Sequence, residues 1–366
     1  MSSVWVDRGM ASLIAGNVVS AKRKASLRGL GVGIMATKVE TVAPIAVQKI
    51  MATDPAHARL AHDAAYEGGA AFVIDHYCPL REAAVPITDL GFGRADAVYD
   101  VVSVSRGQYF RLRHHQERFA RSLERFRLRS PFSFEEERDL LDKLMSLTGL
   151  KDAYVWWAVT RGATPVRAAD RLDPTTFQNR YYAYVIPYLF IGTDEQRQRG
   201  IDLVLSERHV RIPPKSVDPR AKNFHGLDLA MSLYEAGERG GEWSVLPDRD
   251  GNLTESPGSN IFIIKNGVVA TPESGCLEGI TRQTVIDLCE LLGVPCEVRP
   301  VHSDELLSAD EAFLTSTAGG IVPVSSINSV PLGRKQGPGK LTTRIHDEYW
   351  QRRWGGWDSV PVNYGS

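Results

Sequence analysis

The chain has 366 residues and a hydrophobic content of 43%, which is enough to build two cores of ordinary size. Its 43 basic and 44 acidic residues give a net charge of -1, and no basic stripe suited to nucleic acid or to an anionic membrane stands out. Length, composition and charge therefore predict a soluble globular protein of two domains that acts on a small molecule.

The chain has four cysteines: Cys78, Cys276, Cys289 and Cys296. They show neither a CxxC spacing nor the density of a disulfide scaffold, so we expect reduced thiols in a cytoplasmic protein and no structural zinc or other metal site. No window of the sequence approaches the roughly 20 apolar residues that a membrane-spanning helix needs.

Residues 1–42 differ in composition from the rest, because basic residues are frequent there and acids are almost absent before Glu40. We predict a disordered N-terminal extension. The apolar run from Ala11 to Val19 is not typical of a secretory signal, since most of the basic residues follow it instead of preceding it. Met35 is an alternative start of the protein, and the sequence leaves this choice open.

From Gly68 onwards the pattern is that of an α+β unit. The predicted strands are 70–75, 97–104, 109–112, 153–160 and 181–188, and the predicted helices are 113–128 and 133–149. The second helix is supported by a capping box, Ser133 with Glu136. We assign residues 43–190 to a small N-terminal domain with a leading segment, and the polar run 191–200 to an interdomain linker.

The second half of the chain shows shorter strands between tight turns. The predicted strands are 201–206, 244–246, 260–264, 268–270, 297–301 and 312–315, and the predicted helices are 281–292 and 340–354. We assign residues 201–355 to a large C-terminal domain and residues 356–366 to a C-terminal tail.

The segment Arg211–Gly240 places a lysine between a proline-rich loop and a short amphipathic helix. Prolines exclude a helix before Lys222, and apolar residues follow it at helical spacing, so Asn223 is the expected N-cap. An ammonium group beside a helix N-terminus faces the positive end of the helix dipole, which favours the neutral amine. A Schiff-base nucleophile requires a neutral amine, although a solvated loop lysine is the simpler interpretation of this stretch alone.

Four further stretches suit ligand chemistry, and each also has a simpler structural explanation. Glu255 in T-E-S-P-G-S-N is a carboxylate on a turn, where most glutamates are surface residues. The motif G-I-T-R opens a helix near Thr281 with free backbone N–H groups that suit a phosphate, or is only a helix cap. The turn T-A-G-G at Thr317 allows close backbone approach to a ligand, and Arg118 offers a clamp for a phosphate, whereas small-residue turns and solvated arginines are both common.

Together, the lysine, T-E-S-P-G-S-N, G-I-T-R and T-A-G-G, in this order and spacing, resemble the fold-type IV pyridoxal-phosphate aminotransferases. The resemblance is strongest to the (R)-selective amine transaminases, through the segments Arg211–Asn223 and Thr160–Arg167. Branched-chain and D-amino-acid aminotransferases are similar at greater distance. This resemblance implies a two-domain α+β fold, similar to that of D-amino-acid aminotransferase, with the cofactor between the domains and a homodimer whose active sites lie at the subunit interface.

The same resemblance implies roles for individual residues. Lys222 would form the Schiff base with pyridoxal 5'-phosphate and move a proton during the transfer. Glu255 would keep the ring nitrogen of the cofactor protonated, because an adjacent carboxylate stabilises the charged ring. Tyr99 matches the active-site tyrosine of the family. The cofactor phosphate would be bound by four residues: Arg118, Ile280, Thr281 and Thr317.

Several positions bear on the substrate. Arg94 stands where the amine transaminases carry a histidine, and Trp156 stands where branched-chain enzymes place an arginine for the substrate carboxylate. A tryptophan cannot bind a carboxylate by charge, so branched-chain amino acids are disfavoured as donors. Ser259 replaces a phenylalanine of the amine transaminases, and we place it in the substrate pocket with Ala318. Arg167 and Arg94 are the candidates for binding the carboxylate of the acceptor.

The sequence therefore predicts a ping-pong transaminase that moves an amino group from an (R)-configured primary amine to pyruvate or another small 2-oxo acid. A D-amino-acid or branched-chain aminotransferase is the first alternative, and an aminodeoxychorismate-type lyase is a further one. A small-molecule-binding protein without cofactor, in which Lys222 is an ordinary loop lysine, is the alternative from another class.

Overall fold

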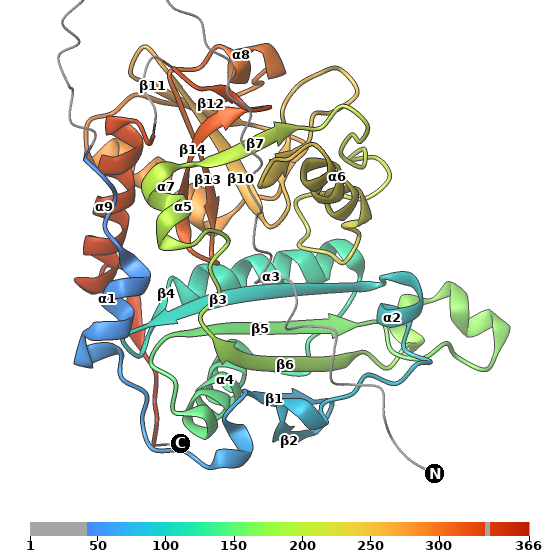
Figure 1. Cartoon of the computed structure of the whole chain (residues 1–366). Helices are drawn as coiled ribbons and strands as arrows, with labels where there is room; N and C mark the ends of the chain where they lie inside the picture. Colours follow the sequence, from blue (N-terminus) through green and yellow to red (C-terminus); the bar gives the residue numbers. More distant parts are fainter. Residues whose placement is uncertain (1–41, 334–336, 366) are drawn as a thin grey trace, which may run out of the picture. The chain divides into compact units, whose positions relative to one another are not determined.

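The computed structural model describes residues 42–333 and 337–365, all of which lie in one compact unit, Thr41–Ser366. The extension predicted for residues 1–42 falls almost wholly outside the described residues. Two β-sheets, of seven and nine strands, organise the described part of the chain (Figure 1). Both sheets carry helices, so the α+β class predicted from the sequence is confirmed.

The first sheet has the strand order β16-β4-β3-β5-β6-β1-β2. Its strands are β1 (Ala70–Val73), β2 (His76–Pro79), β3 (Ala97–Ser105), β4 (Gln108–Phe110), β5 (Ala153–Thr160), β6 (Arg180–Pro187) and β16 (Ser359–Pro361). Leucines and aromatic residues of helices α3 (Leu112–Phe126) and α4 (Phe134–Thr148) pack with this sheet in one core. Helix α3 is therefore held firmly on the sheet, which matters because its other side carries polar residues of the site.

Local signals define the ends of α4 as predicted. The Ser133 hydroxyl accepts from the Glu136 backbone N–H, and the Glu136 carboxylate accepts from the Ser133 backbone N–H, so the capping box is present. The helix ends at Gly149, whose φ of 63° is a left-handed conformation that glycine adopts without strain.

The second sheet has the order β12-β11-β10-β13-β14-β7-β8, with β9 paired to β10 and β15 paired to β14. Its strands are β7 (Ile201–Leu205), β8 (Trp243–Val245), β9 (Glu255–Ser256), β10 (Ser259–Lys265), β11 (Val268–Pro272), β12 (Cys296–Arg299), β13 (Glu311–Ser316), β14 (Gly320–Ile327) and β15 (Val330–Pro331). The helices of this half are α5 (Asp194–Arg199), α6 (Leu227–Glu238), α7 (Ile280–Leu291), α8 (Ser303–Leu307) and α9 (Lys340–Trp354).

Both faces of the second sheet are buried. Along β10, Ile261 and Ile263 belong to one core, whereas Phe262 and Ile264 belong to another, because successive strand residues point to opposite faces. Helices α7 and α9 cover the face that carries Phe262. This packing fixes α7 against the sheet with its first residue, Ile280, near the start of β10, where Gly279 lies against Asn260.

The remaining elements are short helices outside the two sheets. They are α1 (Val47–Thr53), α2 (Leu90–Arg94), η1 (Pro55–His57), η2 (Ala64–Tyr66), η3 (Leu80–Glu82), η4 (Ala168–Leu172) and η5 (Pro174–Thr176). Helices η4 and η5 lie in the long connection between β5 and β6, which Figure 1 shows projecting beyond the strand ends beside α2.

Two segments differ from the sequence prediction. Residues 356–366 were predicted as a tail, but Ser359–Pro361 forms β16, which pairs antiparallel with β4 in the first sheet. The predicted linker 191–200 contains α5, in which Arg197 is fully buried and paired with Asp194 at 2.6 Å. Neither feature has a strong local periodicity, because each is stabilised by contacts with distant parts of the chain.

Within the part of the chain that the structure describes, no helix is long and apolar enough to span a membrane. No group of three or more histidine, cysteine, aspartate or glutamate side chains in the same residues is arranged to hold a metal ion.

Candidate active site

A cavity of about 670 Å³ lies where the first sheet, helix α3 and the second sheet meet. It brings together side chains that are far apart in the sequence. Ten of the twelve residues predicted to form the site line this cavity: Tyr99, Arg118, Trp156, Lys222, Glu255, Ser259, Ile280, Thr281, Thr317 and Ala318. Arg94 and Arg167 do not.

Lys222 is positioned by strand β3 of the first sheet and by helix α3, and not by the helix that follows it in the chain. Its backbone carbonyl accepts from the Tyr99 N–H at 2.9 Å, its own N–H donates to the Ser122 hydroxyl at 3.1 Å, and Asn223 forms an isolated bridge with Val98 of β3. The lysine therefore lies on an extended segment added along β3. Its Nζ is 4.3 Å from the centroid of the Tyr99 ring, within the range of a cation–π contact.

The prediction that Asn223 caps the following helix is wrong. Helix α6 begins at Leu227 with Gly226 as its N-cap, and the Asn223 side chain instead accepts from the His225 N–H at 2.8 Å in a local turn. Because several residues separate Lys222 from α6, the helix dipole acts only weakly on the amine. The surroundings of the Lys222 amine are determined by the pairing of its backbone with β3 and by the Tyr99 ring.

Aromatic rings form one wall of the cavity. Trp156 stacks on Tyr184 with centroids 4.9 Å apart, and Tyr99 contacts Phe224 edge-on at 5.5 Å and Trp156 at 5.9 Å. Three of these rings come from neighbouring strands β3, β5 and β6, whose register places Trp156 opposite Tyr184. The wall is thus a direct result of strand pairing, and it suits an apolar or aromatic ligand group.

Glu255 lies on β9 and is buried, and both of its carboxylate oxygens have partners. Oε1 accepts from Arg211 Nε at 2.9 Å, and Oε2 accepts from the Leu277 N–H at 3.0 Å. Burial raises the pKa of Glu255, and the neighbouring Arg211 opposes this shift. The predicted surface alternative for Glu255 is therefore excluded.

Sequence reasoning missed the partners of Glu255. Arg211 is only 6% exposed and bridges Glu255 to Asp228 near the start of α6, with Nη1 2.7 Å from Asp228 Oδ2. The motif Arg211–Asn223 contained the arginine, but no spacing rule linked it to Glu255. Because Arg211 shares its single positive charge between two carboxylates, it does not fully neutralise Glu255. The Glu255 carboxylate can therefore still attract a second cationic group, such as a protonated ring nitrogen.

The N-terminus of α7 faces the cavity with free backbone donors. No side chain caps this helix, and the first amides of an α-helix have no intrahelical acceptor. Gly279 precedes the helix, and a Cβ at that position would overlap the amide oxygen of Asn260. The approach to Ile280 and Thr281 therefore stays open, as a bound phosphate requires.

Arg118 lies beside this helix start. Its Nη1 contacts the Glu278 carbonyl at 3.4 Å, while Nε and Nη2 donate to the two oxygens of Asp100 at 2.8 and 2.7 Å. His115 Nδ1 is 2.8 Å from the same carboxylate. The Asp100 pair fixes the arginine rigidly, so part of the guanidinium remains directed at α7.

Burial and charge perturb this cluster strongly. Burial opposes ionisation of Asp100, but Arg118 and His115 hold the pKa of Asp100 well below its usual range. Burial lowers the pKa of His115 to about 4. Asp100 and His115 were not predicted as site residues, although Asp100 follows Tyr99 directly in the motif that identified the tyrosine.

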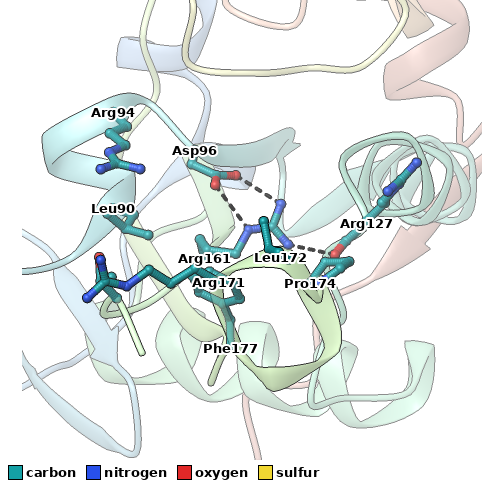
Figure 2. Close-up of a pocket in the computed structure, with 10 residues that line it drawn as sticks. Leu90, Arg94, Asp96, Arg127, Arg161, Arg171, Leu172, Pro174 and Phe177 are labelled. Carbon is teal, nitrogen blue, oxygen red and sulfur yellow. Dashed lines mark hydrogen bonds and ion pairs between the residues drawn. The ribbon is translucent and has the colours of Figure 1, made fainter. Parts of the chain in front are cut away.

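The two remaining predicted residues lie elsewhere. The Arg167 side chain is 81% exposed, with an ion pair of 3.9 Å to Asp170 as its contact. Arg94 ends the short helix α2 and lines a second, separate pocket, shown in Figure 2. In a single copy of the chain, Arg94 and Arg167 therefore do not line the cavity that contains Lys222.

The cavity fits a ligand with three different anchoring groups. Lys222 offers an amine, Glu255 offers a buried carboxylate, and Arg118 with the start of α7 offers an anion site; the hydroxyl of Thr315, which lines the same cavity, is buried without a hydrogen-bond partner. An aldehyde, a basic ring nitrogen and a phosphate would occupy these places in pyridoxal phosphate. Fold and site thus define a pyridoxal-phosphate-dependent enzyme of fold type IV.

The family follows from comparison with known proteins. Residues 97–327 match the model of amino-transferase class IV. The putative branched-chain-amino-acid aminotransferase of Methanocaldococcus jannaschii is 31% identical over 75% of this chain and 94% of that protein. The D-alanine aminotransferase of Bacillus licheniformis is 30% identical over 72% of this chain and 90% of that protein.

Solved structures agree. The branched-chain aminotransferase of Thermoproteus uzoniensis, solved with norvaline, superposes with a TM-score of 0.71 and 27% identity, covering 81% of this chain and 100% of that one. The chain belongs to the class IV aminotransferases and is a pyridoxal-phosphate-dependent aminotransferase. The prediction of a fold-type IV aminotransferase is confirmed, and a binding protein without cofactor is excluded.

Proposed function

We propose that this enzyme transfers the amino group of an (R)-configured primary amine to pyruvate or a similar 2-oxo acid by a ping-pong mechanism. The observation that carries the proposal is the character of the cavity wall. Tyr99, Trp156, Tyr184 and Phe224 present aromatic surface. Such a wall favours a donor with an apolar or aryl substituent.

The charges in the cavity support a donor that carries no carboxylate. Among the lining residues that the structure describes, the arginines are Arg118 and Arg211, and each is held by carboxylates. Neither has a free fork for a substrate carboxylate. A donor that is an amino acid would lack a fixed cationic partner in this copy of the chain, whereas a simple amine needs none.

The proposed reaction assigns specific tasks to the chain. When bound, pyridoxal phosphate supplies the electron sink that stabilises negative charge at the amine carbon. Lys222 Nζ removes the proton from that carbon and returns one during the second half-reaction. Glu255 holds a proton on the ring nitrogen, and Arg118, Ile280, Thr281 and Thr317 bind the phosphate. Tyr99 positions the Lys222 amine through its ring.

The acceptor carboxylate requires a cation that this copy does not place in the cavity. We propose a homodimer in which Arg167, or else Arg94, reaches the cavity of the neighbouring copy. The exposure of Arg167 supports this arrangement, because an 81% exposed arginine is free to contact a second chain. A cytoplasmic location completes the proposal, since all four cysteines are free thiols.

A donor panel tests the substrate class. With pyruvate as acceptor, kcat/KM is measured for (R)-1-phenylethylamine, its enantiomer, D-alanine and L-alanine. We expect the (R)-amine to exceed the others by at least about tenfold, the effect of roughly 1.4 kcal/mol in the transition state. A preference for D-alanine would instead identify a D-amino-acid aminotransferase, the activity named for the Bacillus licheniformis relative. A preference for L-alanine would contradict both.

Replacing Arg167 with alanine tests the acceptor site. We expect the half-reaction with pyruvate to slow by roughly one to three orders of magnitude, the worth of a charge-assisted bidentate contact, while the half-reaction with the amine barely changes. Stopped-flow measurement of each half-reaction separates the two. Equal slowing of both, or of neither, excludes Arg167, and a selective effect of Arg94→Ala would move the role to Arg94.

A further inference from the structure

The connection that follows β6, residues 188–191, contacts the turn that carries Thr317. This turn joins β13 to β14 in the second sheet, whereas β6 belongs to the first. The Tyr188 hydroxyl lies 3.0 Å from the Thr317 carbonyl oxygen and 3.3 Å from the Gly319 nitrogen. A residue at the end of one sheet therefore touches the backbone of a turn in the other.

The direction of each hydrogen bond at the Tyr188 hydroxyl is fixed by its partners. The Gly319 N–H and Arg353 Nη1, which is 3.2 Å away, can only donate, so the hydroxyl oxygen accepts from both. The hydroxyl proton is then left for the Thr317 carbonyl. Because a hydroxyl has one proton and two lone pairs, Tyr188 cannot rotate its hydroxyl away from the turn without losing a hydrogen bond.

Two successive peptide groups of the turn are held at both ends. In the first, the Thr317 carbonyl accepts from Tyr188, and the Ala318 N–H donates to the Ser316 hydroxyl at 3.1 Å. In the second, the Ala318 carbonyl accepts from the last N–H of the connection after β6 at 3.0 Å, and the Gly319 N–H donates to Tyr188. Tyr188 takes part in both groups, so its hydroxyl determines the orientation of the backbone beside Thr317.

The shape of the turn also depends on its glycines. The φ angle is 117° at Gly319 and 74° at Gly320, which are values that side chains disfavour. A Cβ at Gly320 would lie 2.7 Å from a ring atom of Tyr349 on α9. Glycine permits this backbone but does not select it, because glycine has many other conformations available. The contacts from Tyr188 supply that selection.

Arg353 on α9 supports the Tyr188 hydroxyl from behind. Its side chain is only 4% exposed, and it forms no ion pair with a carboxylate of the described residues. The guanidinium lies 5.3, 5.6 and 5.0 Å from the ring centroids of Phe110, Tyr188 and Trp350, and Nη2 has no hydrogen-bond partner. A buried cation without an anion is costly. A doubly charged phosphate at the turn would offset part of this cost.

We propose that Tyr188 is a positioning residue for the cofactor phosphate, because its hydroxyl orients the Thr317–Gly319 backbone and is itself oriented by Arg353. Tyr188 does not line the Lys222 cavity, so it acts through the turn and not by touching a ligand. The inference rests on the phosphate site proposed above. It adds that the affinity for the phosphate depends on how the end of the first sheet meets the second.

The test compares pyridoxal phosphate with pyridoxal, which has the same aldehyde and ring but no phosphate. Each is titrated by absorbance into the full-length chain after removal of its cofactor, and the ratio of the two affinities measures the contribution of the phosphate. Tyr188→Phe keeps the ring and removes the hydroxyl. We expect it to weaken binding of pyridoxal phosphate by about tenfold and to leave binding of pyridoxal unchanged. A role in general stability would weaken both.

Tyr349→Phe is the matched control. The Tyr349 hydroxyl lies 3.4 Å from the same Arg353 Nη1, so this change also removes a hydroxyl beside Arg353 while the bonds from Tyr188 to the turn remain. The affinity ratio should equal that of the wild type. Arg353→Met fills the same apolar surroundings without a donor. It should lower the ratio in the same direction as Tyr188→Phe but less strongly, because Tyr188 can still reach the turn.

The outcomes separate this inference from the proposed phosphate site. If the affinity ratio falls in Arg118→Ala but not in Tyr188→Phe, the phosphate site stands and the role of Tyr188 is wrong. If the ratio is unchanged in both variants, the phosphate binds elsewhere and both proposals are wrong. Equal weakening of the two ligands in Tyr188→Phe, or the same fall of the ratio in Tyr349→Phe, would indicate a general effect on packing and would also overturn the inference.

Discussion

The Lys222 cavity and the second pocket, which is lined by Arg94, Arg127, Arg161 and Arg171, both contain several guanidinium groups, but these differ in burial and in pairing. In the cavity, Arg118 and Arg211 are buried and held by Asp100, Glu255 and Asp228 at distances between 2.7 and 2.9 Å. In the second pocket, Arg94, Arg127 and Arg171 are exposed and form no ion pair with a carboxylate among the described residues.

The difference has a physical cause. A buried charge without a partner costs several kcal/mol, so the cavity must neutralise its arginines and uses them to orient other groups. An exposed arginine is solvated and needs no partner, so its charge stays available for a ligand. The buried arginines here orient carboxylates, and Arg118 also directs part of its guanidinium at the proposed phosphate site. The exposed arginines are candidates for contacting the substrate.

The largest effect is expected from the cavity itself, at Lys222. Lys222→Ala removes the amine that we assign to proton transfer, and proton transfer alone accounts for roughly 10² to 10⁴-fold in rate. Borohydride should no longer fix the cofactor to the protein, as measured by mass spectrometry. Lys215→Ala, at an exposed lysine of the same loop, is the control and should behave as the wild type. If Lys222→Ala transferred amino groups at the wild-type rate, the assignment of proton transfer to Lys222 would be wrong.

Removing one arginine from each region tests the comparison directly. Arg118→Ala leaves the buried Asp100 carboxylate with His115 and the Val101 N–H as partners but without a fixed cation, so we expect a loss of about 3–5 kcal/mol in stability and weaker cofactor retention by tenfold or more. Arg171→Ala, at an exposed arginine without a carboxylate partner, should change stability by less than about 0.5 kcal/mol. Urea denaturation and dialysis of the cofactor measure both. Similar destabilisation in the two variants would contradict the distinction between buried, paired arginines and exposed, unpaired ones.

Glu255→Gln should produce a different pattern from Arg118→Ala. The change keeps the shape of the side chain but removes the charge that we expect to hold the proton on the cofactor ring, so proton removal should slow by about tenfold or more. Cofactor retention should change little. Asp228→Asn should act in the same direction but less strongly, because it alters Glu255 only through Arg211. Single-turnover rates measure both, and equal loss of cofactor in Glu255→Gln and Arg118→Ala would contradict the division of roles.

The last effect is a pH dependence of stability from His115, which is confined to acidic pH. Folding lowers the pKa of His115 from 6.5 to about 4, mainly through burial, so the unfolded chain binds more protons between these values. Stability should therefore fall as the pH drops from 6.5 towards 4. His115→Asn, which retains a donor towards Asp100, should reduce this slope in Tm measurements, and His114→Asn, at the exposed neighbour, should not. An unchanged slope in His115→Asn would show that other groups cause it.

Some elements were predictable because their signals are local. Strand β5 and helix α9 have the bounds predicted from periodicity, Ala153–Thr160 and Lys340–Trp354. The capping box of α4 also depends only on neighbouring residues. In contrast, β14 was missed, since its first five residues are all buried and therefore show no period-two alternation.

The sequence by itself determined the family and most of the residues predicted for the cavity. Short motifs in a given order along the chain are enough to identify a family, even when the positions of their residues in space are unknown. Only the tertiary structure decided how those residues are held. Lys222 is positioned by pairing with β3 and by Ser122 of α3, and not by the helix that follows it, and Arg211 joins Glu255 to Asp228 across the site. These are contacts between residues far apart in the chain, and local periodicity and capping rules carry no information about them. The same holds for Arg94, which the packing of α2 beside the β5–β6 connection places in a pocket separate from the Lys222 cavity.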